Sequence, residues 1–250
     1  MAQRALPERE ARLGRPTGAT DTAPQAVVLV LPGGGAAHSA RRTSAVAAAS
    51  ALTLARRVTR SAHRDGVVSH VLHYRYRGWN DEAAHPAQDA EWAVEEAVRR
   101  YGDVAVSLVG TDVGARAALR AAGHPAVASV LALALWLPEG AHTTEPVRQL
   151  VGRQVLMVHG TDDAHSDPEY SFRYAERVKK VNSSVCRFEV HTDGHGLRRH
   201  SAEVAALARD FVLGTLCARD FARPLVDAMA APPPLGLRMP LASGFGRTLR

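Results

Sequence analysis

Three residues able to do chemistry, Asp112, Asp163 and His195, each follow a short apolar run and lie next to or near a glycine. A carboxylate can act as a nucleophile, and an imidazole can act as a general base near neutral pH. The preceding runs are residues 104–109, 154–159 and 186–191, and their composition is typical of buried strands. Because parallel strands end at one edge of a sheet, the three side chains are expected on loops at that edge.

Asp112 stands between two glycines, Gly110 and Gly114, and an Ala-rich helical pattern begins directly after it. This order predicts a strand, a sharp turn and a helix. Glycines on both sides of a central residue allow a tight bend, which exposes the central side chain beside the helix N-terminus. Taken alone, the same pattern also fits a structural turn or a phosphate-binding loop.

The elements around these loops predict an α/β fold. Six β-rich runs alternate with segments of helical periodicity, as expected for a parallel sheet covered by helices on both faces. We therefore predict a three-layer sandwich around a mostly parallel, doubly wound sheet of about six strands. The runs are residues 26–31, 67–74, 104–109, 127–135, 154–159 and 186–191, and the main helical segments are 43–62, 89–101, 168–181 and 204–216.

The pentapeptide at residues 110–114, GTDVG, resembles the nucleophile elbow of the α/β-hydrolase superfamily, which usually reads GxSxG and in a minority of members GxDxG. The loop at residues 32–35, PGGG, resembles the HGGG motif of that superfamily, with Pro32 in place of histidine. The resemblance implies an oxyanion hole made by the amides of Gly34 and Val113. The alternative is a glycine-rich turn that holds no ligand.

Residues 159–163, HGTDD, resemble the acid loop HGxxD of the same superfamily. The resemblance implies that Asp163 orients the catalytic histidine, and the position of His195 before the last helix resembles that histidine. Asp163 could instead cap the next helix, although Asp167 is better placed to do so. The resemblance covers about residues 26–216. The chain resembles small bacterial members without a lid, because residues 136–153 are too few to form a lid.

Two aromatic residues in the loop at residues 75–80, Tyr76 and Trp79, either line the pocket mouth or pack within the loop. No metal site is expected. His191 and His195 have a spacing used by ligands on helices, but the glycines around His195 indicate a loop, and no partner residue has a recognised spacing. No cofactor motif is found either.

An aspartate at the elbow favours a particular chemistry. Asp112 is ionised at neutral pH and needs no base, but its attack on an ester would form an unfavourable mixed anhydride. Attack at a saturated carbon bearing a halide or an epoxide would form a stable alkyl ester, as in the epoxide hydrolases and haloalkane dehalogenases that the elbow resembles. Two features depart from them: Val113 replaces a tryptophan, and lid tyrosines are absent. The alternative is an altered serine-hydrolase relative that binds a ligand or catalyses proton transfer.

Length and composition suit one globular domain of 250 residues, at 46% hydrophobic. The net charge is +6, and the many arginines, which suggest a GC-rich genome of the actinobacterial type, are scattered among carboxylates. Scattered charge with few aromatic residues argues against a nucleic-acid partner. We expect a small-molecule substrate, no membrane association and a cytoplasmic location; the oligomeric state is left open. The expected division is a disordered lead-in at 1–24, the domain at 25–217 and a loose or disordered extension at 218–250.

Overall fold

The computed structural model describes residues 8–35, 37–60 and 62–246, which fold around one nine-stranded sheet. The strands lie in the order β1-β4-β3-β5-β6-β7-β8-β9, and β2 also pairs with β4. The bounds are β1 Arg12–Leu13, β2 Thr17–Gly18, β3 Ala26–Leu31, β4 Val67–His73, β5 Ala105–Thr111, β6 Val127–Leu133, β7 Gln154–Gly160, β8 Val185–Val190 and β9 Met239–Pro240. The six strands from β3 to β8 are mutually parallel, as predicted.

Strand β3 lies between β4 and β5, so the chain first builds the sheet in one direction and then returns to extend it in the other. In open α/β sheets this reversal leaves a crevice at the carboxyl ends of the two strands, where ligands bind. The pairing register places Leu31 opposite Gly110. The glycine loop after β3 and the turn after β5 therefore leave the sheet side by side.

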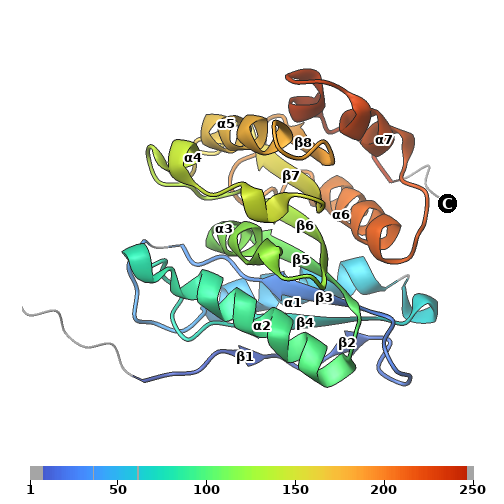
Figure 1. Cartoon of the computed structure of the whole chain (residues 1–250). Helices are drawn as coiled ribbons and strands as arrows, with labels where there is room; N and C mark the ends of the chain where they lie inside the picture. The colour runs from blue at the N-terminus through green and yellow to red at the C-terminus, as the bar shows by residue number, and fades with distance from the viewer. Residues whose placement is uncertain (1–7, 36, 61, 247–250) are drawn as a thin grey trace, which may run out of the picture.

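Helices cover both faces of the sheet, which confirms the predicted three-layer sandwich (Figure 1). Helices α2, α3 and α5 bury their apolar side chains in the core on one face, and α1, α6 and α7 do so on the other. The helices are α1 Ala45–Thr59, α2 His85–Tyr101, α3 Val113–Arg120, α4 Ala141–Thr144, α5 Pro168–Lys179, α6 Ser201–Leu216 and α7 Arg223–Ala230. The segment at residues 136–153 contains only α4 and a short 3-10 turn, so no lid domain lies there.

The N-terminal segment differs from the expected disordered lead-in. Strands β1 and β2 pair antiparallel with β4, and Ala19 is buried. Each strand is only two residues long, too short to show an alternating pattern, and its stabilisation comes from backbone hydrogen bonds that any sequence can make. The expectation was therefore wrong for residues 8–24; residues 1–7 lie outside the described part of the chain.

The C-terminal segment is also ordered, contrary to the expected loose extension. Helix α7 packs on the sheet, and β9 pairs with β8 in parallel. Leu225 and Leu237 are fully buried, and the buried Arg187 donates a hydrogen bond to the Leu237 carbonyl (3.0 Å). Prolines and glycines in this stretch hide the periodicity. The expectation was wrong for residues 218–246; residues 247–250 lie outside the description.

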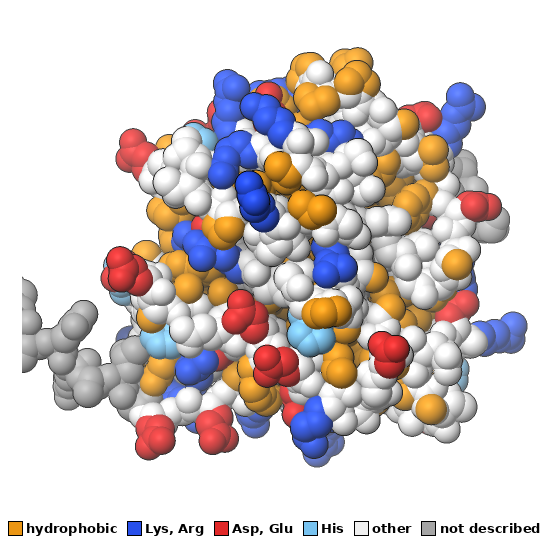
Figure 2. Space-filling model, viewed as in Figure 1, with side chains coloured by type: hydrophobic (Ala, Val, Ile, Leu, Met, Phe, Trp, Pro, Cys, Tyr) orange, Lys and Arg blue, Asp and Glu red, His pale blue; other side chains and the backbone are white. Residues whose placement is uncertain are grey.

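The surface carries mixed charge on the face shown in Figure 2. Basic side chains gather over α4 and α5, acidic and basic side chains alternate below them, and hydrophobic side chains are scattered in small groups. None of the described helices has the length and apolar character that a bilayer crossing requires.

Candidate active site

The turn after β5 has the tight geometry that the glycines predict. Asp112 has φ 56° and ψ −122°, a strained conformation for a residue with a side chain. A side chain at Gly110 would collide with the Gly114 carbonyl, and one at Gly114 would collide with the Leu31 carbonyl. The Asp112 amide donates to the Leu133 carbonyl (3.0 Å), which anchors the turn to β6. The backbone thus holds the Asp112 side chain at the carboxyl end of the sheet.

The two oxygens of the Asp112 carboxylate have different surroundings. Oδ2 accepts hydrogen bonds from the amides of Gly34 (3.1 Å) and Gly35 (2.9 Å). Oδ1 is buried, accepts no hydrogen bond from any described residue and lies 3.6 Å from Nε2 of His195. The Asp112 side chain as a whole is 5% exposed. One oxygen is therefore fixed by the glycine loop, while the other faces the imidazole.

Sequence reasoning named Gly34 and Val113 for the amide pair. The structure places the amides of Gly34 and Gly35 on the Asp112 carboxylate, whereas Val113 is the first residue of α3 and its side chain is buried. Gly35 was missed because the motif assigns only one residue of this loop. Its presence in a run of three glycines was the available signal.

His195 is held by Asp163 on the side away from Asp112. Its Nδ1 lies 2.8 Å from Oδ2 of Asp163, so a neutral imidazole that donates there presents a free lone pair at Nε2. The imidazole joins the two carboxylates, and its distance from Asp112 is within the reach of a bridging water. The structure thus brings the three predicted side chains together.

Asp163 accepts four hydrogen bonds. Besides His195, its oxygens bond Nε2 of His159 (3.0 Å) and the backbone amides of His165 (2.8 Å) and Ser166 (3.0 Å). Burial raises the pKa of Asp163, but these hydrogen bonds outweigh it and hold the pKa well below its ordinary value. Asp163 therefore stays ionised throughout the neutral range and keeps orienting His195.

The acid loop, which carries Asp163, and the histidine loop, which carries His195, are hydrogen-bonded to each other. They follow β7 and β8, which are neighbouring strands with Gly160 opposite Val190. The Asp162 amide donates to the Asp193 carbonyl (3.0 Å), and Asp193 in turn accepts from the His200 amide (3.0 Å) just before α6. These bonds fix the approach of the histidine loop to Asp163.

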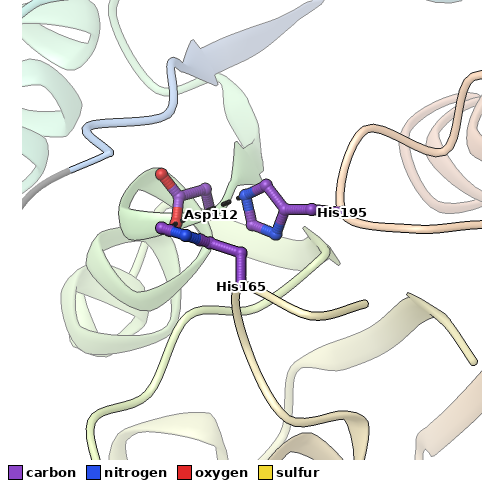
Figure 3. Close-up of side chains that lie close together, drawn as sticks. All are labelled: Asp112, His165 and His195. Atoms are coloured by element: carbon purple, nitrogen blue, oxygen red, sulfur yellow. Dashed lines mark ion pairs between the residues drawn. The ribbon is translucent and has the colours of Figure 1, made fainter. Parts of the chain in front are cut away.

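His165 is a further residue of the site that sequence reasoning missed. Its Nε2 lies 3.9 Å from Oδ1 of Asp112, and its ring packs edge-on against His195 with 4.5 Å between centroids. Figure 3 shows Asp112, His165 and His195 approaching one another from three separate loops. The only signal was the position of His165 two residues after Asp163.

A cavity of about 700 Å³ opens in front of these residues. Asp112, His165 and His195 lie in its wall, which helix α1 and the start of α6 complete. Its apolar lining includes Val46, Leu54, Leu133, Leu197 and Val204, and three arginines also line it: Arg57, Arg77 and Arg198. The volume is typical of a site for a small organic molecule.

The two aromatic residues proposed for the pocket mouth are not among the described residues that line this cavity. Trp79 is buried and stacks on Arg116 of α3, with 3.9 Å from the guanidinium carbon to the ring centre. Tyr76 is buried and packs edge-on against His85. Both residues therefore pack against neighbouring helices, Trp79 on α3 and Tyr76 on α2.

The elbow helix α3 is fixed by a buried ion-pair cluster. Arg116 and Arg120 each make two hydrogen bonds to the carboxylate of Glu145, whose side chain is 3% exposed. Burial opposes the ionisation of Glu145, but the bonds from Arg120 and Arg116 prevail and lower its pKa. Because α3 starts at the nucleophile turn, this cluster supports the position of Asp112.

Glu145→Gln is expected to lower the free energy of unfolding by about 3 kcal/mol, because it leaves the buried Arg116 without a counter-charge. Urea denaturation at pH 7 measures the loss. Glu176→Gln is the matched control: Glu176 pairs with the exposed Arg173 at the surface, where such a pair contributes less than about 1 kcal/mol. Equal effects of the two substitutions would contradict the assignment.

The effect of Glu145→Gln should also depend on pH. Since the folded state lowers the pKa of Glu145 below 4.5, its ionised form stabilises the fold above that pH, and this contribution is lost as the pH falls through the folded-state pKa. The difference in unfolding free energy between the wild-type chain and the variant should therefore shrink on acidification. A difference that grows toward acid pH would contradict this.

Comparisons with known proteins bear on the fold. No protein-family model matches the chain, and no curated protein matches it. Several solved structures are similar to the chain. Est1E from Butyrivibrio proteoclasticus, with ferulic acid bound, is 14% identical with a TM-score of 0.61, over 83% of this chain and 96% of that one. A thermophilic esterase from Thermogutta terrifontis, with butyrate bound, is 16% identical with a TM-score of 0.59, over 84% and 92%.

An alpha-beta serine hydrolase homologue from Coxiella burnetii is 13% identical with a TM-score of 0.58, over 82% of this chain and 98% of that one. At such identities the likeness concerns the arrangement of the backbone. It agrees with the mostly parallel sheet and with the helices on both faces. The chain therefore has the fold of the α/β serine hydrolases and esterases.

Proposed function

We propose that the protein hydrolyses a small organic molecule at a saturated carbon, through an alkyl ester formed on Asp112. The observation that carries this proposal is that the two oxygens of the Asp112 carboxylate have different contacts. Oδ2 lies on the amides of Gly34 and Gly35, whereas Oδ1 accepts no hydrogen bond within the described part of the chain and faces His195. A carboxylate with one oxygen held and one free is prepared to bond through the free oxygen.

In the first step, Oδ1 of Asp112 attacks a carbon that bears a halide or an epoxide oxygen. A carbon–oxygen bond forms, and the bond to the leaving group breaks with its electron pair. The step needs no base because a carboxylate nucleophile has no proton to lose. Ester substrates are disfavoured, since attack on a carbonyl would give a mixed anhydride.

In the second step, Nε2 of His195 takes a proton from water, and the hydroxide adds to the carboxyl carbon of Asp112. The negative charge develops on Oδ2, where the amides of Gly34 and Gly35 stabilise it. The intermediate then collapses, the alcohol leaves with the original Oδ1, and His195 returns the proton. Asp163 holds the imidazole throughout and balances its charge.

An epoxide substrate needs a proton donor for its ring oxygen. No lid supplies a tyrosine here, because residues 136–153 contain only α4 and a 3-10 turn. His165 lines the cavity beside Asp112 and has a half-exposed side chain, so its imidazole is the group placed to donate. The apolar side chains along α1 suit the hydrocarbon part of such a molecule.

The covalent step is tested by a single turnover in heavy-oxygen water. The enzyme is kept in excess over each member of a panel of terminal epoxides and primary bromoalkanes. Water attacks the carboxyl carbon in this mechanism, so the heavy oxygen should enter Asp112, and the first alcohol released should carry ordinary oxygen. Mass spectrometry of the peptide that contains Asp112 measures the label.

Direct attack of water on the substrate would label the product alcohol and leave Asp112 unlabelled. That result in an active enzyme would contradict the covalent mechanism. The same digest provides an internal control, because the peptide that contains Asp163 should gain no label.

A second candidate function is ligand binding, or proton transfer, by a relative of the serine hydrolases that has lost their chemistry. It is favoured by the burial of Oδ1 and by the use of the two glycine amides by Asp112 itself. This candidate predicts saturable binding of small molecules without hydrolysis. Turnover of any panel member that disappears on His195→Ala would exclude a pure binding role.

A further inference from the structure

Asp112, His165 and His195 place three potential metal ligands around one point at the cavity wall. We propose that Oδ1 of Asp112 and Nε2 of both histidines bind one divalent transition-metal ion of the zinc class. The three residues lie on three loops, so no spacing along the chain reveals the site. The inference goes beyond the proposed function and does not rest on it.

The distances suit a single ion after a small contraction. Oδ1 of Asp112 lies 3.6 Å from Nε2 of His195 and 3.9 Å from Nε2 of His165, and each of the three residues offers a ligand atom within 4.8 Å of those of the other two. Bonds of about 2.0–2.1 Å in tetrahedral geometry separate ligand atoms by roughly 3.3 Å. The His165 side chain is 47% exposed, so its ring can rotate toward the other two ligands and close the remaining gap.

An independent observation points to a ligand at this place. Oδ1 of Asp112 is a buried oxygen to which the described residues donate no hydrogen bond, on a side chain that is 5% exposed. A buried carboxylate oxygen without a partner is costly, and a bound cation would satisfy it. Oδ2 is already held by two amides, so the carboxylate can offer a single oxygen.

The surroundings of His195 also match those of a metal ligand. Metal-bound histidines usually donate their second ring nitrogen to a carboxylate or a carbonyl, which fixes the ring. Nδ1 of His195 bonds Oδ2 of Asp163, and the backbone amide of His165 bonds Oδ1 of the same carboxylate. Asp163 therefore orients the imidazole of His195 and holds the backbone at His165.

Two imidazoles and one carboxylate select the ion. This donor set suits Zn²⁺, Co²⁺ and Ni²⁺, whereas Mg²⁺ prefers oxygen ligands alone. The cavity leaves room for water or a small anion at the remaining coordination position. A bound ion would occupy the lone pairs of Asp112 and His195, so it would block the covalent reaction proposed above.

The test uses the full chain after dialysis against a chelator. Co²⁺ is titrated and followed by its visible absorption, and Zn²⁺ and Mg²⁺ are titrated by calorimetry. We expect one Co²⁺ or Zn²⁺ per chain and no saturable binding of Mg²⁺. Loss of a residue that merely supports a metal site weakens affinity about 10- to 100-fold, so His165→Ala, which removes a ligand, should weaken it at least about tenfold.

His63→Ala is the matched control. His63 is 59% exposed and precedes β4, at the opposite end of the strands from the site, and its loss should leave the affinity unchanged. Asp112→Asn provides a second site variant, and circular dichroism checks that each variant folds. The proposal is overturned if the wild-type chain binds neither Co²⁺ nor Zn²⁺ saturably, or if both site variants bind as tightly as the control. Because no substrate is involved, these results stand apart from the hydrolysis tests.

Discussion

An Asp112→Asn variant is expected to lose turnover by about 10⁴-fold, the scale of effect seen when a member of a catalytic triad is removed. The amide oxygen of asparagine can still accept the hydrogen bonds that Gly34 and Gly35 now donate to Oδ2. The neutral amide nitrogen in place of Oδ1 cannot form the ester. Steady-state kinetics on the active epoxide or bromoalkane measures the loss.

The variant should remain folded, because asparagine tolerates the positive φ of this position better than most residues. A thermal melt checks this. Asp162→Asn is the control: Asp162 is an exposed residue of the acid loop, and its loss should leave turnover within about twofold of the wild-type value, as for a surface substitution. Activity retained by Asp112→Asn would show that Asp112 is not the nucleophile.

In a His195→Gln variant, the reaction is expected to stop after the first step. The first step needs no base, so the alkyl ester should still form on Asp112. The second step needs a base for water, so steady-state turnover should fall at least about 100-fold. With a bromoalkane as substrate, rapid mixing should show a burst of about one equivalent of bromide per chain, which is the sign of a covalent intermediate.

Intact-protein mass spectrometry should then find the chain heavier by the alkyl group, and digestion should place the group on the peptide that contains Asp112. The double variant with Asp112→Asn should show no adduct. If His195→Gln neither turns over nor forms an adduct, His195 is required before the ester forms, and the two-step scheme is wrong.

The positions of Asp112, Asp163 and His195 could be predicted because each follows a strand whose composition is clear. In a parallel sheet the carboxyl ends of such strands meet at one edge. The turn geometry at Asp112 could also be predicted, since Gly110 and Gly114 leave room that no other residue would allow. Local composition was therefore sufficient to predict the features of the site that backbone geometry determines.

Other parts of the site could not be predicted, because they depend on packing between distant segments. Nothing near His165 in the sequence shows that its ring meets Asp112 and His195. Trp79 looked like a pocket residue by type, yet it packs on Arg116, whose partner Glu145 comes from a later segment. The contact of the Gly35 amide with Asp112 depends on how the Asp112 carboxylate turns, which no motif encodes.

The terminal strands have a consequence for how the chain is handled. Strands β1 and β2 pair with β4 on one side of the parallel core, and β9 pairs with β8 on the other. A protein shortened to residues 25–217, the limits suggested by composition, would uncover rows of unpaired amides and carbonyls along both outer strands of that core. Unpaired edge strands of this kind readily pair with other chains. The two short terminal segments therefore protect the sheet against self-association.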